Sequence, residues 1–139
     1  MNVNITTYGS EVTRKYPKYD EVYTAGRILS PAEFQSLEEA SRAFGVEAYT
    51  ACEAMSLRTL ESALRKIYGV EEMLGSLINR AEKDPRLTDM VGVVQYFRNV
   101  RNRVAHPEKL SSKLDAESTF AMTKRLLLEL EEKTRSTPS

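Results

Sequence analysis

Cysteine and histidine are nearly absent from this chain, which has one of each among 139 residues. A single cysteine, Cys52, excludes an internal disulfide and a zinc site built from cysteines. One cysteine and one histidine also supply too few sulfur and nitrogen ligands for a transition-metal site made by this chain alone. We therefore expect no metal and no other cofactor.

Long apolar runs and a net charge are also missing. No stretch approaches the roughly 18 apolar residues of a membrane span, and no charged-then-apolar leader opens the sequence. We therefore expect a cytoplasmic protein without a membrane partner. Lys plus Arg and Asp plus Glu number 20 each. Bulk charge thus predicts no affinity for nucleic acid, and any basic site must be local.

The composition favours one folded domain with two irregular ends. Hydrophobic residues make up 41% and charged residues 29%, which is typical of a soluble globular protein. We expect an irregular tyrosine-rich N-terminal arm at 1–29, a helical bundle at 30–133 and a frayed tail at 134–139. The tyrosines of the arm alternate with cations, a pattern that suits stacking on nucleic acid or packing onto protein, and we favour packing.

Helical periodicity with clear start and stop signals dominates residues 30–133. "SPAE" is a capping box, with Ser30 as N-cap, Pro31 at the first helical position and Glu33 reaching back to the cap amide. Gly45 is expected to end this helix in a left-handed conformation. Further helices are expected at 46–68 with Gly69 as terminator, at 71–82, at about 88–106, and from Ser111 or Ser112 onward.

No segment alternates convincingly with a period of two, so strands are not expected. The predicted fold is an all-α antiparallel bundle of four main helices plus a short one.

Two charged residues interrupt the apolar faces of these helices. On a helical wheel with Phe97 at zero, Arg101 falls at about 40°, inside the apolar stripe of the 88–106 helix. Glu53 falls on the apolar face of the 46–68 helix, beside Leu57 and Leu60. Because a buried charge destabilises unless it is paired, we expect Glu53 and Arg101 to form a structural ion pair.

The segment "RNRVAHP" at 101–107 holds the only histidine, His106, at the point where a proline must end the helix. An arginine near a titratable histidine suits a phosphodiester, since arginine binds the phosphoryl oxygens and histidine transfers a proton. The alternative is a plain helix C-terminus whose cations complement the helix dipole. From these residues alone, the alternative is favoured. The surrounding cations are Arg98, Arg101, Arg103 and Lys109, against one anion, Glu108.

Two longer stretches carry a resemblance to a known family. "ACEAMSLRTLESALRKIYG" and, later, "YFRNVRNRVAHPEKLSSKLDAESTFAMTKRLLLEL" resemble the HEPN superfamily of small α-helical domains. The family signature is an arginine, usually followed by a polar residue, with a histidine at the end of the same helix. Arg101, Asn102 and His106 match it, with four residues between the arginine and the histidine. The resemblance covers about residues 31–132. The tyrosine that one toxin branch has between arginine and histidine is absent here.

The resemblance implies a homodimer whose two motifs face each other, and often a metal-independent endoribonuclease of toxin, abortive-infection or CRISPR-associated defence systems. Such enzymes cleave RNA through the 2′-hydroxyl and leave a 2′,3′-cyclic phosphate. An antitoxin is then a possible partner. Other HEPN domains are non-catalytic modules that bind RNA or nucleotide, or that dimerise. Dimerisation would bring Arg101 and His106 together, because an unbroken helix separates them by about 140°.

Three hypotheses follow for this chain. The first is a homodimeric endoribonuclease, in which Arg101 stabilises the phosphate charge, Asn102 orients the phosphate or the imidazole, and His106 transfers the proton. The second is a non-catalytic module that binds RNA, nucleotide or a protein, and the third is a purely structural bundle. In the first hypothesis, the RNA backbone is contacted by Arg98, Arg103 and Lys109. Glu53 supports Arg101 from behind and does not contact the RNA.

Overall fold

The computed structural model describes residues 30–106, 108 and 110–136, with side chains as far as residue 134. Within these residues every regular element is a helix, as the sequence predicts. The expected N-terminal arm at 1–29 lies outside the described residues. The elements are α3 (Pro31–Gly45), α4 (Tyr49–Tyr68), α5 (Leu74–Glu82), the 3₁₀ helix η1 (Pro85–Met90), α6 (Val91–Val104) and α7 (Lys113–Ser136).

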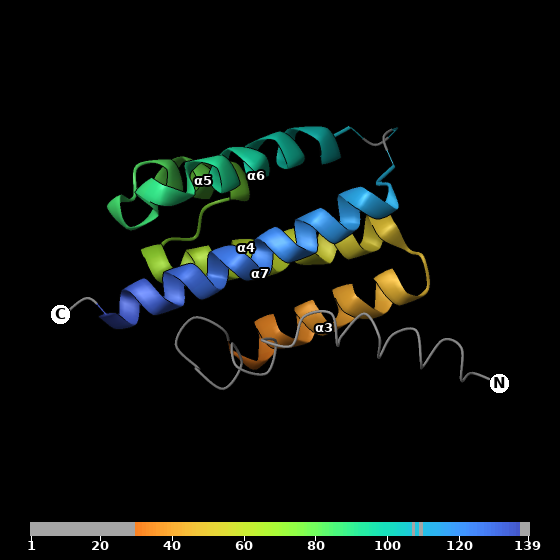
Figure 1. The fold of residues 1–139 in the computed structure, drawn as a ribbon, viewed down its shortest axis with the longest axis horizontal. Coiled ribbons are helices and arrows are strands. Elements are labelled where there is room, and N and C mark those ends of the chain that lie inside the picture. Colours follow the sequence, from red (N-terminus) through yellow and green to blue (C-terminus); the bar gives the residue numbers. More distant parts are fainter. Residues whose placement is uncertain (1–29, 107, 109, 137–139) are drawn as a thin grey trace.

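The helices form three layers (Figure 1). The two longest, α4 and α7, pack together as the middle layer, and α3 packs against both of them from one side. A hairpin of α5 and α6 covers the other side. The described part of the chain is thus an antiparallel bundle of five α-helices, in which α5 is the shortest. Helix α7 continues to Ser136, beyond residue 133 where we expected the bundle to end.

Helix α3 begins and ends at the predicted residues, but the left-handed residue at its end is a different one. The backbone N–H of Ser30 donates to Oε1 of Glu33 over 2.8 Å, and Pro31 is the first helical residue. The prediction that Gly45 is left-handed is wrong, because Glu47 has the positive φ, at 64°. The N–H of Ala48 donates to the carbonyl of Ala43 over 2.8 Å. The left-handed residue thus lies two positions after Gly45, where the helix ends, and α4 begins at Tyr49 rather than near residue 46.

Glu33 joins α3 to α4 through a buried carboxylate. Its side chain is 1% exposed and accepts hydrogen bonds from Ser30, from Ser62 and, at 2.5 Å, from Nζ of Lys66. Burial alone would raise the pKa of this carboxyl, but the hydrogen bonds from Lys66, Ser30 and Ser62 outweigh it and lower the pKa from 4.5 to about 2. The charged form of Glu33 therefore stabilises the folded state.

The stability of the protein should consequently fall in acid through Glu33. Since the folded-state pKa is lower than the unfolded one, the contribution is complete above pH 4.5 and is lost as the pH falls from 4.5 to about 2. We expect a contribution of about 2–3 kcal/mol, discounted because Lys66 is half exposed. Urea unfolding of Glu33→Gln should show a flatter pH dependence in this window, whereas Glu39→Gln, exposed on the same helix, should follow the wild type.

The start of α5 is set by contacts from α4 rather than by its own sequence. Gly69 ends α4 with a φ of 65°, as predicted. Residues 71–73, which we expected to be helical, instead form a connection. The carbonyl of Glu72 accepts from Nε of Arg65 over 2.8 Å, and the N–H of Leu74 donates to Oε2 of Glu61 over 2.9 Å. Since Glu61 satisfies the first free N–H of α5, the helix begins at Leu74.

Helix α6 begins after a 3₁₀ turn and runs along the core. The carboxylate of Asp84 accepts from the backbone N–H of Arg86 at 2.9 Å and caps η1, so α6 begins at Val91 rather than near residue 88. No described helix is long and apolar enough to cross a membrane. The residues of the predicted apolar stripe that are buried are Met90, Val93, Val94, Phe97 and Val100.

Candidate functional site

The Arg-Asn-x-x-x-His motif lies at the end of α6, where three helix termini meet. Figure 1 shows the C-terminus of α6 at the same end of the bundle as the N-termini of α4 and α7. The backbone N–H of Ser111, just before α7, donates to Oγ1 of Thr50 in the first turn of α4 over 3.1 Å. The turn that carries His106 therefore spans from α6 to a point fixed on α4.

Arg101 of α6 is exposed, and its side chain lies against α5. A β-carbon placed on Gly75, the second residue of α5, would lie 3.3 Å from Cζ of Arg101. Its Nη1 donates to Oδ1 of Asn102 over 3.4 Å. Across the described residues, no carboxylate forms an ion pair with Arg101. None of the described carboxylates therefore neutralises the positive charge of Arg101.

The predicted Glu53–Arg101 ion pair is wrong, because Arg103 occupies that place. The Glu53 side chain is 0% exposed, as its helical position predicts, and Oε2 accepts from Nη2 of Arg103 over 2.6 Å. The same oxygen accepts from Oγ1 of Thr119 on α7, and Oε1 accepts from Oγ of Ser111 over 2.5 Å. One buried carboxylate thus ties together α6, α7 and the connection between them.

Arg103 is held from two sides. The hydrogen bond to Glu53 raises the pKa of the Arg103 guanidinium and keeps it charged. Its Nη1 also lies 3.6 Å from Oδ2 of Asp115, in the first turn of α7. Asp115 completes the expected cap of α7: the N–H of Ser112 donates to its carboxylate over 2.9 Å, and its own N–H donates to Oγ of Ser112 over 3.0 Å. Arg103 of α6 therefore links α4 and α7 through its charge, and the RNA contact expected of it stays a prediction.

The positions of helices α5 and α7 explain why the helical wheel selected the wrong arginine. On the wheel, Arg101 lies about 40° to one side of Phe97 and Arg103 about 120° to the other. The side of Arg101 faces Gly75 on α5, while the side of Arg103 carries Tyr96, whose hydroxyl lies 2.8 Å from Oγ1 of Thr119 on α7. Glu53 lies toward α7, so only Arg103 reaches it.

His106 lies in solvent just beyond α6. Its side chain is 60% exposed, and Nδ1 lies 3.6 Å from Oε1 of Glu108, which is itself exposed. Its backbone N–H donates to the carbonyl of Arg103 over 3.1 Å, so the main chain is still held by the helix end. In the part of the chain that the structure describes, no hydrogen bond joins His106 to Arg101 or Asn102. One copy of the chain brings the three motif residues to one end without closing them into a site.

The other predicted RNA contacts differ from Arg101. Arg98 donates to both carboxylate oxygens of Glu82, over 2.9 and 2.6 Å, and to Oδ1 of Asn79. Its charge is therefore already balanced by an acid on α5. Lys109 lies outside the described residues. Of the three arginines in the last two turns of α6, Arg101 is the one without an acidic partner among the residues described.

Several residues of this end were not predicted from the sequence. Ser111 was expected only as a helix cap, and Thr119 and Gly75 carried no pattern that separated them from their neighbours. Their roles depend on contacts across 58, 66 and 26 positions of the chain, from Ser111 and Thr119 to Glu53 and from Gly75 to Arg101. Glu53 itself was found because an acid on an apolar helix face requires a partner.

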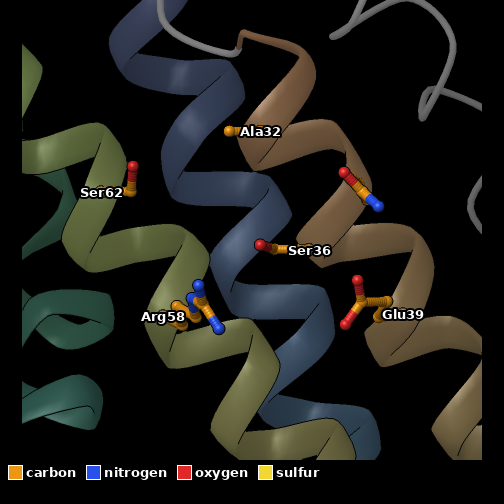
Figure 2. A pocket seen from close by; sticks show the side chains of 6 residues that line it. Ala32, Ser36, Glu39, Arg58 and Ser62 are labelled. Carbon is orange, nitrogen blue, oxygen red and sulfur yellow. The ribbon is translucent and has the colours of Figure 1, made fainter.

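A second arginine offers a comparison for Arg101. Figure 2 shows Arg58 of α4 in a polar groove, with Ser36 and Glu39 of α3 opposite. The groove has a volume of about 240 Å³ and lies between α3 and α4, whereas Arg101 lies on the α5–α6 hairpin. Arg58 is exposed and therefore provides a matched control for any experiment on Arg101.

Comparison with known proteins identifies a family but no function. No curated protein and no solved structure matches the chain. A family model described as "Domain of unknown function (DUF4145)" matches residues 38–137, which include α4 to α7 and the whole motif. Because this match spans well over half of the sequence, the chain belongs to the DUF4145 family.

Proposed function

We propose that this protein is a metal-independent endoribonuclease that acts as a homodimer. In each copy Arg101 binds the phosphate, Asn102 orients it or the imidazole, and His106 transfers a proton. The resemblance to HEPN domains supports this proposal, and so does the position of the motif residues, all exposed at one end of the bundle. The antitoxin partner that the resemblance suggests stays a prediction.

The observation that carries the proposal is the free charge of Arg101. Arg98 and Arg103, three residues before it and two after it, each bind a carboxylate, whereas Arg101 lies exposed without one in the described chain. A guanidinium that needs no internal partner can form paired hydrogen bonds to the oxygens of a phosphodiester. It would stabilise the negative charge that grows on those oxygens as the bond is cleaved.

The chemistry requires two proton transfers. One group removes the proton of the 2′-hydroxyl, the O2′–P bond forms as the P–O5′ bond breaks, and a second group protonates the departing 5′-oxygen. The products are a 2′,3′-cyclic phosphate and a 5′-hydroxyl. The chain has one histidine. Two copies related by a two-fold axis would supply two imidazoles to one cleft.

Exposed apolar residues beside the motif support the homodimer. Leu110 is 79% exposed and Leu114, in the first turn of α7, is 70% exposed, while Val104 at the end of α6 is partly exposed. Large apolar side chains that cluster at a surface are typical of protein interfaces. A second copy that covered these three residues would bring its own motif close to the motif of the first copy.

Purified protein should cleave single-stranded RNA in the presence of EDTA. The expected products carry a 2′,3′-cyclic phosphate, which mass spectrometry of the fragments distinguishes from a 3′-hydroxyl. EDTA leaves the rate unchanged because arginine and histidine supply the charge and the protons. Binding of RNA without any cleavage would instead support the non-catalytic alternative. A chain that neither binds nor cleaves RNA would contradict both proposals.

The dimer should depend on the apolar residues next to the motif. We expect the double variant Leu110→Glu/Leu114→Glu to be a monomer by light scattering and to lose at least about tenfold in cleavage rate, because buried carboxylates oppose association. Val91→Glu is the matched control, since Val91 is 64% exposed at the opposite end of α6. A fully active monomeric double variant would show that one copy contains the whole site.

A further inference from the structure

The side chain of Arg101 lies on a bare part of α5. A β-carbon on Gly75 would lie 3.3 Å from both Cζ and Nη2 of Arg101, and 3.4 Å from Nε. All three are guanidinium atoms, so the charged group itself, and not only its aliphatic stem, covers the helix at this point. These separations are tighter than ordinary van der Waals contact, and any side chain at position 75 would displace the guanidinium.

The other glycine that begins a helix has no such neighbour. Gly92 is the second residue of α6, just as Gly75 is the second residue of α5. A β-carbon on Gly92 would meet nothing within 4 Å. Glycine is a poor helix former at both positions. Only at Gly75 does the absence of a side chain make room for another residue.

We propose that Gly75 is a positioning residue for Arg101, an inference that rests on the proposed function. Arginine has a long, flexible side chain whose many rotamers would spread its charge over several orientations. Contact with the bare surface of α5 limits these orientations and holds the guanidinium ready for the phosphate. Catalysis gains from such preorganisation, because small errors in the placement of a charged group reduce the rate.

The matched variants Gly75→Ala and Gly92→Ala test this role. Both replace a glycine by a better helix former, so both should melt at or above the temperature of the wild type. Gly75→Ala alone should lower kcat, by about three- to tenfold, as expected when a charged group moves by a fraction of an ångström. Gly75→Leu, with a larger side chain that also favours helix, should lower kcat further.

A second readout separates this inference from the proposed function. The NMR signal of the Arg101 Nε–H group reports on the environment of the guanidinium whether or not the protein cleaves RNA. We expect the signal to shift in Gly75→Ala and to stay in place in Gly92→Ala. An unchanged signal in Gly75→Ala would overturn the inference even if the wild type is an active nuclease. Equal kcat values for the two alanine variants would also overturn it. Failure of the wild type to cleave RNA, with the shift present, would contradict the nuclease instead.

Discussion

Replacement of His106 by alanine is expected to abolish RNA cleavage while the protein still melts at the temperature of the wild type. His106 is the only histidine of the chain, and proton transfer by a positioned group typically contributes about 10²–10⁴-fold to a rate. In a homodimer the substitution removes both imidazoles at once, so the loss should reach at least the upper part of this range. The fold should not change, because the side chain is 60% exposed.

The controls for this prediction distinguish proton transfer by His106 from phosphate binding by Arg101. Arg101→Ala should also abolish cleavage and should in addition weaken RNA binding, whereas His106→Ala should leave binding nearly intact. Arg58→Ala removes an exposed arginine from the α3–α4 groove (Figure 2) and should change neither property. The assay is a time course with labelled RNA in EDTA, together with fluorescence anisotropy for binding. Cleavage by His106→Ala at the wild-type rate would remove His106 from the mechanism.

Replacement of Glu53 by alanine is expected to destabilise the protein more than loss of any exposed acid. The change removes a fully buried carboxylate and leaves Arg103, Ser111 and Thr119 without their shared acceptor. Breaking a buried ion pair from one side costs about 3–5 kcal/mol. We expect about 2–4 kcal/mol here, because Arg103 is 26% exposed and water can solvate part of its charge. Urea unfolding followed by circular dichroism would measure the loss.

The exposed ion pair between Arg98 and Glu82 provides a matched control for the Glu53 prediction. Arg98 on α6 pairs with Glu82, but both side chains are about one-third exposed. Glu82→Ala should therefore change the unfolding midpoint little, since exposed ion pairs contribute little to stability. The double variant Glu53→Leu/Arg103→Met should recover much of the stability lost in Glu53→Ala, because no charge remains buried without a partner. Equal effects of Glu53→Ala and Glu82→Ala would show that burial does not decide the strength of these pairs.

Loss of Glu53 should also loosen the turn that carries His106. Glu53 binds Arg103, three residues before the histidine, and Ser111, five residues after it. Both ends of the turn therefore depend on the same carboxylate. The structural effect on the folded protein would appear as faster hydrogen exchange at the N–H of His106, which donates to the carbonyl of Arg103 in the wild type.

The local signals in the sequence predicted most of the helix boundaries. The predicted capping box of Ser30 with Glu33 depends on residues three apart and forms, and Ser112, one of the two serines expected to cap α7, bonds to Asp115. Gly69 ends α4 as expected, and it does so in a left-handed conformation. Helix α3 ends at Gly45 as expected, but Gly45 is not left-handed, and α5 starts later than expected. In both places the chain used a hydrogen bond that local sequence rules do not indicate, to Ala43 in one case and from Leu74 to Glu61 in the other.

In the candidate site, too, some features follow from the local sequence and others only from contacts between helices. The sequence alone determined that residues 30–136, as far as they are described, are mainly helical, that the motif ends a helix, and that Glu53 is buried, because each of these follows from spacing along one helix. Tertiary structure alone decided which arginine neutralises Glu53 and which has no acidic partner among the described residues. The angle of a side chain on its own helix does not reveal which neighbouring helix lies on that side. With α7 beside Arg103 and the bare surface of Gly75 beside Arg101, the packing gave the first two acidic neighbours and placed the second against α5.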